Sequence, residues 1–151
     1  MRSSDVFVVR RSRATTAFLE RHLSPREFRR YLAYEGELKR GGCAHGGYRL
    51  LAVDGGDFPI CCRHLFRGLR MFTIYAPDGE IWIPLVAPHT AASNPHAEIA
   101  EGLPGLATIG RRRRDKPPCC DDPARPPVLS DEAQAFITHV CLGVQAGASA
   151  C

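Results

Sequence analysis

Two groups of cysteine and histidine residues have side chains that commonly bind metal ions in proteins. Cys43 and His45 form the first group, and Cys62 and His64, preceded by Cys61, form the second. Thiolate sulfur and imidazole nitrogen are the usual ligands of a structural zinc ion. His45, Cys62 and His64 are therefore candidate zinc ligands. The alternative is a set of buried thiols beside unliganded histidines, because cysteine is among the most buried residue types.

A further group combines a histidine and a glutamate with two cysteines. One alanine separates His96 from Glu98, and Cys119 and Cys120 follow a proline. This pattern resembles the signature of the zinc-dependent cytidine deaminase superfamily, His-x-Glu followed by Pro-Cys-x-x-Cys. The resemblance implies that His96, Cys119 and Cys120 bind zinc and that Glu98 transfers protons. Aspartate replaces the last cysteine of the signature, and a surface helix bearing His96 and Glu98 is the alternative interpretation.

A run of basic residues suggests contact with phosphate groups. The run consists of Arg111, Arg112, Arg113, Arg114 and Lys116. Clustered cations of this kind bind nucleic acid or act as nuclear-localisation signals, because they release counterions from phosphates. The sequence has no aromatic residue between Trp82 and Phe136, so base stacking is not expected here. A solvated charged loop is the alternative.

The basic residues are distributed unevenly along the chain. The 151 residues include 20 basic and 16 acidic ones, a net charge of +4, and every basic residue except Lys39 and Lys116 is arginine. Residues 1–40 hold ten basic and five acidic residues, a net charge of +5. Arginine binds carboxylate and phosphate with a planar fork of donors. The N-terminal third is therefore a candidate docking face for an anionic partner.

The length and composition predict one globular domain. Hydrophobic residues make up 44% of the chain, which is ordinary usage, and no stretch is apolar enough to span a membrane. The start has no apolar segment of a secretory signal, so we expect an intracellular protein, cytoplasmic or, in a eukaryotic cell, nuclear. The odd count of seven cysteines agrees with a reducing compartment.

The usual nucleotide-binding and hydrolase signatures do not occur. The chain has no Gly-x-Gly-x-x-Gly, no Walker loop and no Gly-x-Ser-x-Gly elbow. We therefore expect a small basic accessory or regulatory protein of the kind that viruses and phages encode. We expect it to be non-enzymatic and to bind a protein or nucleic acid. We do not expect it to associate with a membrane or to have a small-molecule substrate. A zinc-dependent deaminase-like hydrolase and a domain with a structural zinc are the alternatives.

The N-terminal elements would present the basic residues. Residues 5–10 are rich in β-formers and predict a short strand, and Thr15 or Thr16 would cap a helix over residues 17–23. Ser24, Pro25 and Glu27 form a capping box with proline at the first helical position, which predicts a helix ending at Gly41–Gly42. The arginines of this helix would occupy its outer face.

Two hairpins are predicted in the middle of the chain. Residues 47–66 contain a Gly-Gly turn at positions 55 and 56, and residues 71–83 contain a turn over 77–79. In the first hairpin a two-residue loop would place Arg49 opposite Cys62 and Gly47 opposite His64. Pro84 would make the end of the fourth strand an edge.

The predicted fold is α+β. Its sheet is an antiparallel four-stranded meander of two hairpins, with the N-terminal helices and a C-terminal helix packed on one face. The chain would form one domain over residues 1–142, with an irregular proline- and arginine-rich loop at 87–127, a helix starting after Ser130, and a disordered tail at 143–151. The expected core residues are Leu51, Val53, Ile60, Phe72, Ile74 and either Trp82 or Ile83.

Overall fold

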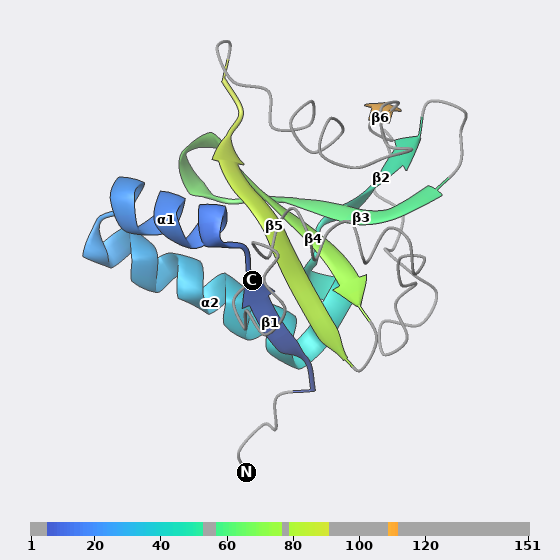
Figure 1. Ribbon diagram of the computed structural model, residues 1–151, viewed down its shortest axis with the longest axis horizontal. Helices are drawn as coiled ribbons and strands as arrows, with labels where there is room; N and C mark the ends of the chain where they lie inside the picture. Colours follow the sequence, from blue (N-terminus) through green and yellow to red (C-terminus); the bar gives the residue numbers. More distant parts are fainter. Residues whose placement is uncertain (1–5, 53–56, 77–78, 91–108, 112–151) are drawn as a thin grey trace.

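The computed structural model describes residues 6–52, 57–76, 79–90 and 109–111. In chain order the elements are β1 (Val8–Arg11), α1 (Arg13–His22), α2 (Pro25–Gly41), the 3₁₀ turn η1 (Gly42–His45), β2 (Tyr48–Ala52), β3 (Asp57–His64), the 3₁₀ turn η2 (Phe66–Gly68), β4 (Leu69–Ala76), β5 (Glu80–Pro88) and β6 (Ile109–Arg111). Figure 1 shows the two helices lying together beside the sheet.

The sheet is mixed, and its strand order is β1-β5-β4-β3-β2-β6. Strands β2 to β5 pair antiparallel with their neighbours in the chain. Strand β1 pairs parallel with β5, so that Val8 lies opposite Glu80 and Arg11 opposite Ile83. The expected antiparallel four-stranded meander is therefore wrong. Local turn signals predict which consecutive strands pair, but they carry no information about a strand that joins the sheet from the far end of the chain.

Pro84 lies within β5, directly after the last residue that pairs with β1, so the described pairings agree with the prediction that the strand becomes an edge here. Strand β5 pairs with β1 as far as Ile83 and continues to Pro88, and in the described ranges this second half pairs with β4 alone. The register of β4 and β5 shifts near this proline: Ile74 lies opposite Trp82, but Phe72 lies opposite Leu85. Such a bulge accommodates the missing N–H of proline. The Pro84 carbonyl accepts a hydrogen bond from the Ser12 hydroxyl at 2.9 Å.

Helix α1 starts earlier than the sequence suggested. Ser12 is its N-cap, and the Ser12 hydroxyl accepts a hydrogen bond from the Thr15 N–H at 3.0 Å. Thr15 is therefore not the cap but a buried residue in the first turn, and its hydroxyl lies 3.3 Å from the Ile83 carbonyl. The Ser12 and Thr15 contacts fix the start of α1 against β5.

Helix α2 follows the prediction from its capping box. The Ser24 hydroxyl accepts from the Glu27 N–H at 3.2 Å, and the Glu27 carboxylate accepts from the Ser24 N–H at 3.1 Å. The helix runs without interruption past Gly36 to Gly41. Tyr31 and Leu38 are fully buried on its inner face. The inner-face apolar residues attach α2 to the sheet.

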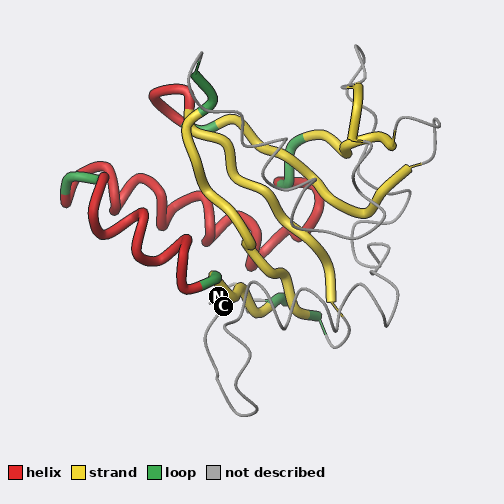
Figure 2. Tube along the Cα trace, turned by 45° about the horizontal axis from the view of Figure 1, so that its top comes forward, coloured by secondary structure: helices red, strands yellow, loops and turns green. Residues whose placement is uncertain are grey.

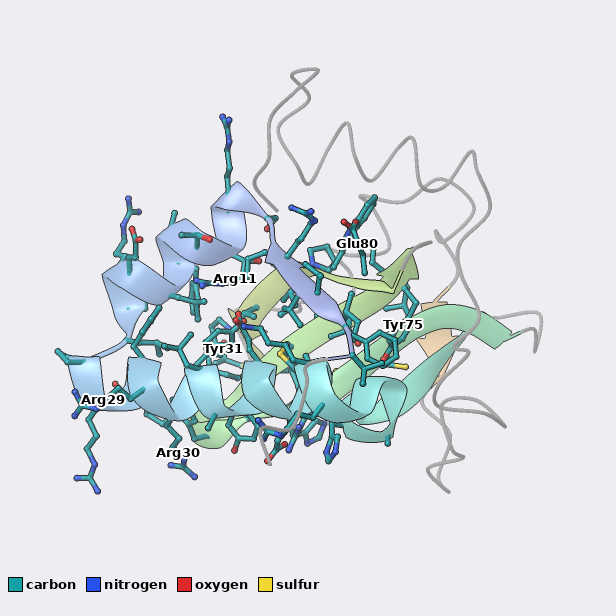
Figure 3. The ribbon with its side chains drawn as sticks, turned by 90° about the horizontal axis from the view of Figure 1, so that it is seen from below. Arg11, Arg29, Arg30, Tyr31, Tyr75 and Glu80 are labelled. Carbon is teal, nitrogen blue, oxygen red and sulfur yellow. The ribbon has the colours of Figure 1, made fainter. Side chains whose placement is uncertain are left out.

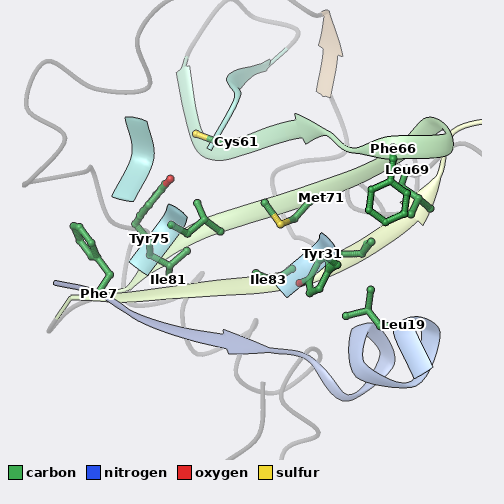
Figure 4. Close-up of a cluster of buried hydrophobic side chains, with 12 residues drawn as sticks. Phe7, Leu19, Tyr31, Cys61, Phe66, Leu69, Met71, Tyr75, Ile81 and Ile83 are labelled. Carbon is green, nitrogen blue, oxygen red and sulfur yellow. The ribbon is translucent and has the colours of Figure 1, made fainter. Parts of the chain in front are cut away.

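Both helices cover the same face of the sheet (Figure 2). Figure 4 shows the core on this face, which includes Leu19 and Tyr31 from the helices. The cluster also contains Phe7 from the segment before β1, Phe66 from η2, and the sheet residues Cys61, Leu69, Met71, Tyr75, Ile81, Ile83 and Val86.

The predicted core was assigned largely to the wrong face. Ile60, Phe72, Ile74 and Trp82 are buried, but they alternate with the helix-facing residues and so point to the opposite face. Of the predicted set, Ile83 lies in the helix-facing cluster. Both faces of these strands are apolar, so alternation alone could not identify the face that carries the helices. The side chains of residues 51 and 53 lie outside the described part.

The register of the first hairpin differs by one residue from the expected one. Tyr48 lies opposite Cys62 and Arg49 opposite Cys61, with a register shift between Arg49 and Leu51. Because successive side chains alternate, a shift of one residue moves the whole strand to the other face relative to its partner.

The turn at 53–56, the helix expected after Ser130 and the tail at 143–151 lie outside the described residues.

Candidate functional site

The structure separates the residues of the first predicted zinc site. Arg63 of β3 faces α2, where its guanidinium lies 2.6 Å from the Glu37 carboxylate. By strand alternation Cys62 and His64 point to the other face of the sheet. His45 stays on the α2 side: its imidazole Nδ1 lies 3.8 Å from the Glu37 carboxylate, and its carbonyl accepts from Arg63 at 3.0 Å. His45 is therefore not brought together with Cys62 and His64.

No cluster of three or more histidine, cysteine, aspartate or glutamate side chains suited to a metal ion occurs within the described ranges. Cys61 and Cys62 are buried and form no disulfide in the described part of the chain. The deaminase-like residues His96, Glu98, Cys119 and Cys120 lie outside the described residues. Their predicted roles therefore stay predictions.

One residue of the predicted basic run belongs to the described structure. Arg111 is the last residue of β6, and its main chain lies opposite Leu51 of β2. Arg112, Arg113, Arg114 and Lys116 lie outside the described part. The start of the run is thus extended backbone in β6, which forms the edge of the described sheet beyond β2.

Arginines from three elements gather where the two helices meet. The last turn of α1 carries Arg21, the first two turns of α2 carry Arg26, Arg29 and Arg30, and η2 carries Arg67. We call these five residues the arginine tip. Figure 3 shows Arg29 and Arg30 on the first turns of α2. The arginine tip is the candidate site for an anionic ligand.

A short, well-anchored connection holds this end of the helix pair. Helix α1 ends where the Leu23 N–H donates to the Leu19 carbonyl at 3.1 Å. Leu23 also packs against the core, and Ser24 begins the capping box of α2. Two residues therefore reverse the chain, so the last turn of α1 and the first turn of α2 stay close together.

Arg67 joins the arginine tip from the turn between β3 and β4. It adopts a positive φ of 53°, a conformation that non-glycine residues rarely occupy. Its guanidinium forms an ion pair with Glu27 and lies 3.5 Å from the His22 carbonyl. Arg67 therefore connects the sheet to both helices at their junction.

The pKa of the Glu27 carboxyl lies below its ordinary value. The backbone N–H of Ser24 is the main cause, since it donates to the ionised carboxylate; the Ser24 side chain and the charge of Arg67 act in the same direction. Glu27 is therefore ionised over the physiological range. Its charge is already matched by Arg67, which leaves the neighbouring arginines uncompensated.

Arg30 is oriented by an aromatic ring, whereas three other arginines are not engaged. The Arg30 guanidinium lies 4.9 Å from the centre of the Phe66 ring, which is 9% exposed. Arg21, Arg26 and Arg29 are exposed, and no ion pair involves them in the described part of the chain. The tip thus presents guanidinium groups to solvent, where an anion can reach them.

The position of these arginines on α2 does not favour helix stability. The N-terminus of a helix carries a partial positive charge, so cations in the first turns are unfavourable. Arg26, Arg29 and Arg30 lie in these turns, and Glu27 is the acidic residue of the first turn. The dipole and the arginines instead add up to a positive field that attracts anions.

The sequence identified part of this site. The capping box and helical spacing placed Arg26, Arg29 and Arg30 on the outer face of one helix, within the basic N-terminal third. Arg67 was missed, because it lies far along the chain from the helices and has no neighbouring basic run. Its signal is the tertiary contact with Glu27, which no local pattern reveals.

The chain matches none of the protein-family models, curated proteins or solved structures with which it was compared.

Neither α1 nor α2, the helices of the described ranges, has the length and apolar character required to cross a membrane.

Proposed function

We propose that this protein is a non-enzymatic intracellular accessory or regulatory protein that binds nucleic acid through the arginine tip. The observation that carries the proposal is the gathering of Arg21, Arg26, Arg29 and Arg30 at one end of the helix pair. Phosphate contacts by arginine supply most of the affinity of sequence-independent nucleic-acid binding. Arginine also matches phosphate with two parallel hydrogen bonds.

The composition of the site favours contact with the backbone over reading of bases. Phe66, the aromatic residue in contact with the tip, is buried and already faces Arg30. Exposed aromatic rings on which bases could stack are not part of the tip as described. The ligand we propose is therefore duplex nucleic acid, recognised by the charge and spacing of its phosphates. Arg111, on β6 at the edge of the sheet beyond β2, would make a separate contact with phosphate.

The first prediction concerns the salt dependence of binding to a generic DNA duplex. The change is the double variant R26Q/R29Q, which removes two positive charges from the tip. Each lost phosphate contact lowers the slope of log K against log salt by about 0.9. We expect a slope smaller by about 1–2 and weaker binding at low salt. Fluorescence anisotropy of a labelled duplex across a salt series measures both.

The matched control is R13Q/R40Q, which removes the same net charge from exposed positions away from the tip. Arg13 is the first residue of α1, and Arg40 lies in the last turn of α2. We expect this variant to keep the wild-type slope. Equal losses in the two variants, or a wild-type protein that does not bind duplex at low salt, would contradict the proposal.

A further inference from the structure

Strand β1 forms one edge of the described sheet. Its one neighbour there is β5. The Val8 N–H donates to the Gly79 carbonyl at 2.9 Å, and the Ser12 N–H donates to the Ile83 carbonyl at 3.1 Å. The main-chain groups of the even-numbered residues therefore face β5.

The odd-numbered residues turn their main-chain groups outward. The Phe7 N–H donates to the Lys39 carbonyl at the end of α2, at 3.0 Å. Val9 and Arg11 have the same orientation, and no backbone partner for them occurs in the described part of the chain. Their two N–H and two C=O groups form a short open edge suited to pairing with another strand.

A cleft of about 400 Å³ runs along this edge between the two helices. It is lined by Val9, Arg10, Arg11, Thr16, Glu20, Phe28, Glu35 and Lys39. Two of its cations already have partners: Arg10 lies 2.8 Å from Glu80, and Arg11 lies 2.9 Å from the buried Glu35. Lys39 has no ion pair within the described ranges. The cleft therefore offers one unmatched cation, Lys39 near the end of α2, and one carboxylate without an ion pair in the described ranges, Glu20 on α1.

The strand also exposes apolar side chains. Val8 is 52% exposed on the face away from the helices, and Val6, which precedes the strand, is 61% exposed. Sheet edges are commonly protected by proline, bulges or unpaired charges. Strand β1 has no proline, pairs with β5 in unbroken register and has both arginines matched by glutamates. An added strand would cover Val8 and complete the main-chain hydrogen bonds.

We propose that β1 binds an extended segment of a protein partner as an additional strand, with a carboxylate side chain of that segment directed to Lys39. Strand addition derives affinity from main-chain bonds and specificity from alternate side chains. A second copy of this chain is a poor occupant. Antiparallel pairing through Val9 and Arg11 would place Arg10 opposite the same arginine of the other copy, and like charges directly opposite are unfavourable.

The experiment uses blocked synthetic hexapeptides of alternating valine and threonine, with one central glutamate or lysine. Binding is followed by amide hydrogen exchange and by ¹H–¹⁵N shifts of the full-length protein. We expect the glutamate peptide to slow exchange at Val9 and Arg11 while Arg10, already bonded to β5, stays unchanged. Two N-methylated peptides are compared, one methylated at its odd-numbered residues and one at its even-numbered residues. Methylation should abolish binding in the peptide whose methylated N–H groups face β1 and preserve it in the other, because only one edge of the peptide pairs with β1.

The variant K39E tests the charge preference, and R40E is its matched control on the outer face of α2. We expect K39E to weaken binding of the glutamate peptide by about 2–5-fold and to favour the lysine peptide, since an exposed ion pair contributes up to about 1 kcal/mol. R40E should leave both affinities unchanged. The proposal would be overturned if the peptide left hydrogen exchange at the Val9 and Arg11 amides unchanged, or if both N-methylated peptides bound equally well. It would also be overturned if the protein self-associated with rising concentration and this protected the same amides without peptide.

Discussion

Glu27 participates in three contacts at the start of α2. Its carboxylate accepts from the Ser24 N–H, its own N–H donates to the Ser24 hydroxyl, and its carboxylate pairs with Arg67. Two of these contacts depend on the negative charge of the side chain. The same carboxylate is the acidic group in the first turn of a helix that otherwise begins with arginines.

We predict that Glu27 makes stability dependent on pH in the acid range. Its folded-state pKa is lowered, so its contribution is complete above its unfolded pKa of about 4.3 and is lost as the pH falls through the folded value. The variant E27Q should therefore be less stable than wild type at neutral pH, and this difference should shrink as the pH falls below about 4. Urea unfolding at a series of pH values measures the difference.

The control for this prediction is E20Q. Glu20 is exposed on α1, and no ion pair involves it in the described part of the chain. Its replacement should change stability little at any pH. A difference between E27Q and wild type that stays constant from neutral pH to pH values near 2 would show that the charge of Glu27 is not the cause.

Among the elements, the connection from α2 to β2 depends on Gly47. This residue has φ of 90°, and a Cβ atom there would lie against the Cys62 carbonyl oxygen and 2.8 Å from the Arg63 Cα. Both obstacles are main-chain atoms of β3, which cannot move without disturbing its pairing with β4. The close approach of these backbones sets where β2 begins.

We predict that G47A is much more destabilising than G68A. Gly68 also has a positive φ, 71°, but a Cβ atom there would meet only the His89 carbonyl oxygen at 3.8 Å. G68A should cost about 1–2 kcal/mol for the left-handed conformation alone. G47A should cost more than about 3 kcal/mol, because the main chain must also shift. Chemical denaturation provides both values, and equal losses would contradict the role assigned to Gly47.

The accuracy of the sequence-based fold depended on the distance over which each signal acts. The Ser24 capping box predicted α2 correctly because all its contacts lie within one turn. The parallel pairing of β1 with β5 and the register shift in β5 were missed, because both depend on segments far apart in the chain. The arginines of α2 were placed on its outer face by helical spacing, whereas Arg67 reaches Glu27 through a tertiary contact. The sequence therefore predicted features whose contacts lie within one helical turn, but it did not predict contacts between distant segments.

At the scale of the whole molecule, the sheet combines pairings of very different sequence separation. The β4–β5 hairpin brings Ala76 opposite Glu80 across a short turn. In contrast, Arg10 of β1 donates a hydrogen bond to the side chain of Glu80 from 70 positions away in the chain. Closing a long loop costs more conformational entropy than closing a short one. The parallel edge is therefore expected to form after the antiparallel centre of the sheet.

This order of assembly predicts how core variants change the folding kinetics. Phe7, just before β1, is 7% exposed, and Ile74 in the middle of β4 is fully buried. F7L and I74V should each cost about 1 kcal/mol, through lost packing. F7L should mainly accelerate unfolding, because its contacts form after the transition state, whereas I74V should slow folding. Stopped-flow measurements across a denaturant series separate the two rates. Slower folding of F7L, with an unchanged unfolding rate, would mean that β1 docks early and that the parallel pairing nucleates the sheet.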